Sequence, residues 1–112
     1  MTSAADSAAL SQCIEHCLRC YRECFETAMT VCLEHGDKHV SPAHFRLMMA
    51  CAETCRAAAA VMMARLPGHS ALCWVCAQIC EDCARDCESM EHMSACVAAC
   101  RDCAAHCRKM SA

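Results

Sequence analysis

Cysteine dominates the chemistry available to this chain, because 16 of its 112 residues are cysteine. Most of them recur at alternating spacings of three and four residues. The runs are Cys13, Cys17, Cys20 and Cys24; Cys73, Cys76, Cys80, Cys83 and Cys87; and Cys96, Cys100, Cys103 and Cys107, with Cys51 and Cys55 as a further pair. This spacing is typical of the buried seam of a bundled helix, which Leu, Ile and Val normally fill. Here thiols occupy the seam.

Thiols in rows along a helix can chelate soft metal ions. Side chains four residues apart have Cβ atoms about 5–6 Å from each other, so two thiolates can converge on one ion. Structural zinc prefers four ligands in a closed tetrahedron, whereas rows suit an ion that accepts two or three thiolates. Cu(I) is such an ion and is selected by Cys and Met. Because one thiolate can bridge two ions, we expect multiple Cu(I) ions, up to about one per cysteine.

Cys32 does not follow the repeat. On an ideal helix it lies about 100° away from Cys13, and Val31 occupies the seam instead. Cys32 is therefore a candidate ligand that lies outside the main stripe.

Histidine and methionine gather at the turns of one end of the expected bundle, where they form a candidate mouth for metal. These residues are His35, His39, His44, Met48, Met90, His92 and Met93. Neutral imidazole and thioether bind Cu(I) more weakly than thiolate, so they would receive the ion and pass it inward. His44 and Met48 are the preferred ligands, since they share the helix face of Cys51 and Cys55. His106, and His16 near it, are candidate auxiliary ligands at the other end.

Several other interpretations of the cysteine pattern remain open. They are an inert core of small apolar side chains, disulfides between helices, an iron–sulfur cluster, a thiolate buffer for zinc, cadmium or silver, and a sensor or chaperone for one or two ions. The ferredoxin spacing is absent, and i,i+3 and i,i+4 positions on one helix are poorly placed for disulfides. No catalytic set of Ser, His and Asp or glycine-rich phosphate loop stands out, so we do not expect an enzyme.

The elements that position the thiols are predicted to be four helices, over residues 6–35, 42–66, 70–89 and 94–109 of a single domain spanning residues 1–112. Gly36 terminates the first helix. Ser41 as N-cap and Pro42 at the first helical position begin the second, and Pro67 and Gly68 end it. No segment alternates with period two. Short connections favour antiparallel packing, so we expect an all-α, antiparallel four-helix bundle with a cysteine-lined core.

Composition excludes some partners. The formal net charge is -3, with acids and bases interspersed, so no basic surface for nucleic acid is expected. The longest apolar stretch, residues 57–64, is about half of what a membrane span needs. Residues 1–12 lack the features of a secretory signal. We therefore expect a cytoplasmic protein. Thiols stay reduced in the cytosol, so this location favours metal binding over disulfide formation.

The cysteine runs resemble those of the bacterial copper storage proteins (Csp), in particular their cytosolic branch. The resemblance rests on the runs CxxxCxxCxxxC from Cys13, CxxCxxxCxxCxxxC from Cys73, and CVAACRDCAAHCRKM at residues 96–110, and it covers nearly the whole chain. It implies a bundle whose inward cysteines load with Cu(I), assembly into a tetramer, a role in storing or detoxifying copper, and a His- and Met-lined opening through which copper enters.

The second helix departs from this pattern, since it carries only two cysteines and an apolar lower seam of Ala58, Ala59 and Met62. We expect fewer copper ions there. A second apolar strip beside its seam, together with Trp74, makes a homo-oligomer plausible. The strip consists of Phe45, Met49, Ala52, Ala59 and Met63.

Overall fold

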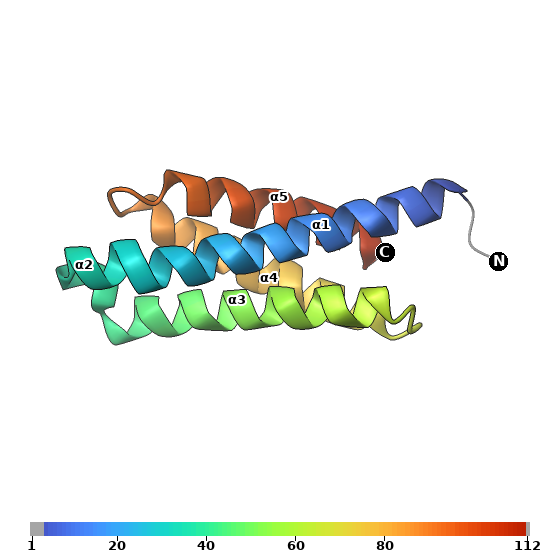
Figure 1. Cartoon of the computed structure of the whole chain (residues 1–112), viewed down its shortest axis with the longest axis horizontal. Helices are drawn as coiled ribbons and strands as arrows, with labels where there is room; N and C mark the ends of the chain where they lie inside the picture. Colours follow the sequence, from blue (N-terminus) through green and yellow to red (C-terminus); the bar gives the residue numbers. More distant parts are fainter. Residues whose placement is uncertain (1–3, 112) are drawn as a thin grey trace.

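The computed structural model describes residues 4–111, which form an antiparallel bundle of four helical rods (Figure 1). The elements are α1 (Ala4–Thr27), η1 (Ala28–Cys32), α2 (Leu33–His35), η2 (Asp37–Val40), α3 (Pro42–Met63), α4 (His69–Glu88) and α5 (Ser94–Met110). The first rod consists of α1, η1 and α2 in direct succession. Residues 4–111 contain no strand, so the predicted all-α bundle is confirmed.

Each rod packs against two neighbours. α1 contacts α3 and α5, and α4 contacts the same two helices, so α1 and α4 lie diagonally across the bundle. The molecule measures 50 × 19 × 19 Å. α2, η2 and the connection at residues 89–93 lie together at one end, which we call the histidine end because it carries His35, His39 and His92 (Figure 1). None of the described helices is both long and apolar enough to cross a membrane.

The ends of the helices follow local backbone preferences. Gly36 follows α2 with φ 72°, a conformation that glycine adopts without strain. Ser41 occupies the N-cap of α3 and Pro42 its first turn. α3 ends at Met63 and not at Leu66, because the chain turns at Arg65, whose φ is 60°. α4 and α5 begin and end close to the predicted residues 70–89 and 94–109.

The last part of the first rod is not a regular α-helix, and this changes the position of Cys32. Residues 28–32 form a π-helix, in which each turn holds more residues than in an α-helix. The Thr30 hydroxyl donates to the carbonyl of Glu26 at 2.7 Å, a bond that competes with the backbone ladder. Cys32 is fully buried, whereas Val31 is only half-buried. The prediction that Val31 occupies the seam was therefore wrong.

The core consists mainly of small or flexible side chains. All of the cysteines are buried. Around them lie alanines such as Ala52, Ala59 and Ala77, which allow the helices to approach closely, and the buried methionines Met48 and Met62. His39 and His44 are the buried polar side chains of the described part of the chain. The bundle thus encloses an almost uncharged interior rich in sulfur.

Candidate metal centre

Thiols from different helices meet along the axis of the bundle. Cys24 on α1 lies 3.5 Å, sulfur to sulfur, from both Cys96 and Cys100 on α5, and 3.8 Å from Cys51 on α3. Cys51 in turn lies 3.7 Å from Cys80 on α4. A disulfide bond is about 2.05 Å long, and all of the cysteines are free. These contacts place reduced thiols from all four rods around one interior axis.

The thiols form five overlapping sets, and within each set the sulfur atoms lie within 4.8 Å of one another. The sets are Cys17, Cys76, Cys103 and Cys107; Cys20, Cys24, Cys51 and Cys100; Cys20, Cys55, Cys80 and Cys103; Cys24, Cys83, Cys96 and Cys100; and Cys13, Cys73 and Cys107. Several cysteines belong to two sets, so ions in neighbouring sets would share thiolates. Among the cysteines, only Cys32 and Cys87 lie outside these sets.

Burial and mutual contact keep protons on several of these thiols. Contacts with Cys107 and Cys13, together with burial, raise the pKa of Cys73. Burial raises the pKa of Cys32 to about 11, with a smaller contribution from Cys96. A metal ligand must be the thiolate, so an ion that binds these groups has to displace a proton from each.

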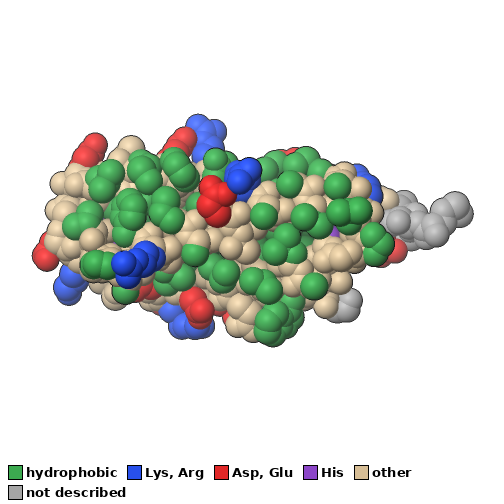
Figure 2. Space-filling model, turned by 90° about the horizontal axis from the view of Figure 1, so that it is seen from below, with side chains coloured by type: hydrophobic (Ala, Val, Ile, Leu, Met, Phe, Trp, Pro, Cys, Tyr) green, Lys and Arg blue, Asp and Glu red, His purple; other side chains and the backbone are tan. Residues whose placement is uncertain are grey.

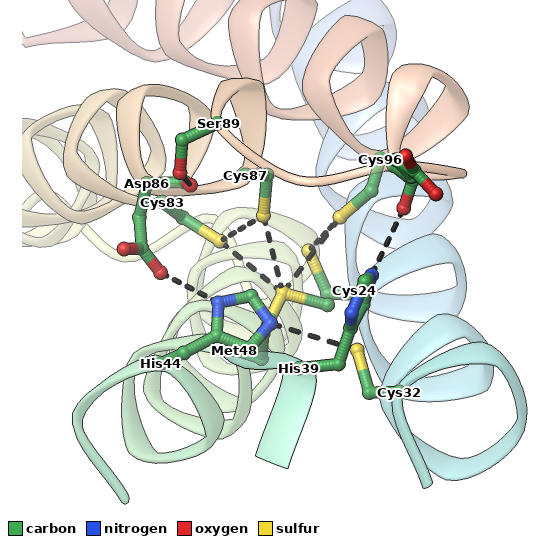
Figure 3. A network of polar contacts seen from close by, with 11 residues as sticks. Cys24, Cys32, His39, His44, Met48, Cys83, Asp86, Cys87, Ser89 and Cys96 are labelled. Carbon is green, nitrogen blue, oxygen red and sulfur yellow. Dashed lines mark hydrogen bonds and ion pairs between the residues drawn. The ribbon is translucent and has the colours of Figure 1, made fainter. Parts of the chain in front are cut away.

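His44 and Met48, which lie one helical turn apart on α3, both contact thiols at the histidine end (Figure 3). His44 is 2% exposed, and its Nε2 lies 3.5 Å from Cys32 Sγ. Met48 Sδ lies 3.5 Å from Cys87 Sγ and 3.6 Å from Cys83 Sγ. The structure thus brings the two predicted non-cysteine ligands of this end into the thiol column, although their role as ligands stays a prediction.

Asp86 on α4 is the residue of this region that sequence reasoning missed. Its Oδ2 lies 2.6 Å from His44 Nδ1 (Figure 3). The only sequence signal is its position directly before Cys87, which places Asp86 beside the seam of α4. The bond crosses between two helices, and a local pattern does not reveal such a partner.

A series of imidazoles leads from the surface to this site. His35 and His92 are exposed, and their ring centroids are 5.7 Å apart. The ring centroid of His35 lies 4.3 Å from that of His39, which is buried. The ring centroids of His39 and His44 are 6.2 Å apart. His39 Nε2 contacts the carbonyl of Glu91 at 2.9 Å, which attaches η2 to the connection before α5.

The methionines of the histidine end lie beside this series. Met93 is buried and Met90 is half-buried. Both line a pocket of about 510 Å³ that also reaches Cys87. The predicted mouth residues are therefore neighbours in space.

His106 lies at the opposite end of the bundle, where its ring stacks on that of His16 with a centroid distance of 3.9 Å. Its Nδ1 lies 2.8 Å from the carbonyl of Asp102 and donates to it. Nitrogen lone pairs lie in the plane of the ring, so two stacked imidazoles do not converge on one ion. A ligand role for His106 stays a prediction.

The lower part of α3 contributes apolar side chains where the other helices contribute thiols. Ala58, Ala59 and Met62 are buried. The thiol set nearest this end has only three members, Cys13, Cys73 and Cys107. The low thiol content expected there from the sequence is present in the structure.

Comparisons with known proteins agree with this architecture. The family model described as "Csp: Copper storage protein" matches residues 6–112. The uncharacterized cysteine-rich protein YhjQ of Bacillus subtilis is 37% identical over 102 residues, which cover 89% of this chain and 94% of the relative.

Solved structures superpose over most of the chain. A crystal structure of a protein from Nitrosospira multiformis has a TM-score of 0.93 and 47% identity, covering 94% of this chain and 96% of its own. The Cu(I)-bound copper storage protein BsCsp3 has a TM-score of 0.84 and 36% identity, covering 93% and 99%. Apo-Csp3 from Bacillus subtilis has a TM-score of 0.79 at 36% identity, covering 91% and 98%. From its sulfur-lined bundle and from these matches, the chain belongs to the copper storage protein family.

Proposed function

We propose that this protein stores or buffers Cu(I) by binding many ions to the thiolates of its core. The observation that carries the proposal is the set of five overlapping thiol groups, to which all four rods contribute. Overlap lets one thiolate bridge two ions, so the number of ions can approach about one per cysteine. The similarity to the Cu(I)-bound BsCsp3 supports the choice of metal.

The charge of the core favours a monovalent ion. Replacing one thiol proton by one Cu(I) leaves the interior neutral, whereas a divalent ion held by four thiolates leaves a net charge of -2. An uncompensated buried charge is costly, and no Lys or Arg is among the buried residues of the described chain. Filling the whole column is therefore favourable only with ions such as Cu(I).

The distances between sulfur atoms suit an ion held by three or four thiolates. Contacting thiols are 3.5–4.0 Å apart. With metal–sulfur bonds of about 2.3 Å, three thiolates around an ion lie about 4.0 Å apart and four lie about 3.8 Å apart. Little movement of the helices is needed to form either site.

A second candidate function is a thiolate buffer for zinc or cadmium. It is favoured because the observed sulfur–sulfur distances also match those of a four-thiolate site. Its capacity is limited by the sharing of cysteines. The set around Cys76 and the set around Cys51 have no common member, but each further four-thiol set overlaps one of them. About two closed tetrahedral sites can therefore exist at once without shared ligands.

Anaerobic titration of the fully reduced protein with Cu(I), against a competing chelator of known affinity, tests the proposal. We expect tight uptake of about one ion per cysteine, and a parallel Zn(II) titration should saturate near two ions that Cu(I) displaces. Saturation with Cu(I) at one or two equivalents would instead indicate a sensor or chaperone. The metal-free protein should remain helical, and its collapse on chelation would contradict the view that the bundle is preformed.

We also propose that the protein is not an enzyme. Contacts link Cys32 to His44 and His44 to Asp86, which is how a nucleophile, a general base and an orienting acid are linked in an active site. A nucleophilic cysteine, however, is accessible and has a lowered pKa. Cys32 is fully buried and its pKa is raised to about 11, so it lacks both properties of a nucleophilic cysteine.

We propose in addition that the protein forms a homo-oligomer, a tetramer by family resemblance. The face viewed in Figure 2 carries many apolar side chains with scattered charges. Met63 and Trp74 are each 52% exposed. Ala52 and Ala59 of the expected apolar strip are already buried within the bundle, so the strip is narrower than predicted. Sedimentation equilibrium tests the assembly, and a monomeric mass would refute it.

A cytoplasmic location remains a proposal as well. It is supported by the requirement that the core thiols stay reduced, since the cytosol maintains reduced thiols. Fractionation of the source cells followed by immunoblotting tests it, and recovery in an extracytoplasmic fraction would refute it.

A further inference from the structure

Cys32 and His44 stand apart from the other core donors. Cys32 belongs to none of the five thiol sets, and its Sγ lies 3.5 Å from a nitrogen, His44 Nε2. We propose that Cys32 and His44 form a mixed thiolate–imidazole site for one Cu(I) ion, and that Asp86 is the positioning residue that orients His44 for it. This inference rests on the proposed function, because the ion is the cargo of the thiol column.

Asp86 determines which nitrogen of His44 faces the thiol. His44 Nδ1 lies 2.6 Å from the Asp86 carboxylate, which is an acceptor only, so Nδ1 carries the proton and donates it. In the neutral ring, Nε2 then holds the lone pair and faces Cys32 Sγ. A carboxylate that orients a ligating histidine in this way is a common arrangement around bound metals.

The distance between the donors suits a bound ion. With bonds of about 2.3 Å to sulfur and 2.0 Å to nitrogen, a sulfur–nitrogen separation of 3.5 Å corresponds to an angle of about 110° at the metal. That angle leaves room for a third donor. If the separation between Cys32 Sγ and His44 Nε2 increased by about 0.8 Å, these two donors alone could coordinate the ion linearly.

The backbone supports the same assignment. Cys32 reaches the interior because residues 28–32 form a π-helix, and such segments are frequent at functional sites. The site lies between the imidazole of His39 and the thiol column that begins with Cys24 and Cys96 (Figure 3). The ring of His35 in turn lies beside that of His39. Binding replaces the S–H bond of Cys32 by an S–Cu bond and releases the proton to solvent, with no change in oxidation state.

Nitrogen-15 NMR of the histidine rings tests the site directly. In the metal-free protein we expect His44 to show the tautomer protonated at Nδ1. During anaerobic titration with Cu(I), the His44 Nε2 resonance should shift. An unshifted His44 Nε2 at full loading of the wild-type protein would overturn the proposal.

Four variants test the roles separately. With a competing chelator present, Asp86→Ala should raise the free Cu(I) needed for the His44 shift by about 10- to 100-fold, and Asp86→Glu should restore most of it. Asp82→Ala, an exposed aspartate one turn earlier that pairs with Arg85, is the matched control and should change nothing. Cys32→Ala should abolish the shift while the metal-free protein keeps its helical circular dichroism. An Asp86→Ala protein that keeps both the tautomer and the wild-type midpoint would refute the positioning role.

The total capacity of the wild-type protein separates the two levels of inference. High capacity with an unresponsive His44 refutes the mixed site and leaves storage standing. Capacity of one or two Cu(I) refutes storage itself, whatever His44 does.

Discussion

Replacing Cys24 by alanine should affect Cu(I) and Zn(II) binding very differently. Cys24 is fully buried and belongs to two of the four-thiol sets. If Cu(I) is held by two or three shared thiolates, losing one sulfur removes about one ion of about sixteen, because the neighbouring thiolates rearrange around the rest. Zn(II) needs four ligands, so Cys24→Ala breaks both sets and reduces the closed sites from about two to about one.

Cys87→Ala is the matched control for this change. Cys87 is also fully buried, and its sulfur lies 3.5 Å from Met48, but it belongs to none of the four-thiol sets. We expect it to remove about one Cu(I) and no Zn(II). Each variant deletes one buried methyl-sized group, so each metal-free protein should lose about 1 kcal/mol of unfolding free energy.

The assay is a pair of anaerobic titrations of both variants and the wild type, with metal and protein measured in the same desalted samples. Guanidinium denaturation of the metal-free proteins checks that each variant is folded. A loss of four or more Cu(I) in Cys24→Ala would refute the reasoning, since it would mean that copper occupies discrete sets that fail as units. An unchanged Zn(II) capacity in Cys24→Ala would show that the tetrahedral sets are not where zinc binds.

Three further changes follow from the same core. Loading the metal-free protein with Cu(I) at neutral pH should release about one proton per ion, measured by pH-stat titration; far fewer protons would mean that the thiolates are preformed. Met62→Cys should raise Cu(I) capacity by about one, because it adds a thiol to the buried lower part of α3, which contributes none; unchanged capacity in a folded variant would contradict this. Because burial raises the pKa of Cys32 from 9.0 to about 11, the stability that its protonated form provides is complete below pH 9 and is lost as pH rises to about 11. Between pH 9 and about 11, the unfolding free energy of the reduced, metal-free wild-type protein should fall more than that of Cys32→Ala. Equal pH profiles of the two proteins in denaturation experiments would refute this prediction.

The amino-acid sequence by itself determined the helices and the sulfur seam. A spacing of three and four residues places Cys13, Cys17, Cys20 and Cys24 on one face of any α-helix, whatever surrounds it. Gly36 and Pro42 mark the first turn between rods through their own backbone preferences. These properties are local, so they are predictable before the chain folds.

Only the tertiary structure decided which donors meet. The contacts of Cys24 with Cys51 and Cys100 depend on how far each rod is shifted and rotated against its neighbours, and no single helix encodes this. Cys32 was misplaced by ideal periodicity, because a π-helix changes the register within the rod. The bond between Asp86 and His44 joins two helices, so the residue that orients a candidate ligand becomes recognisable only after α3 and α4 pack.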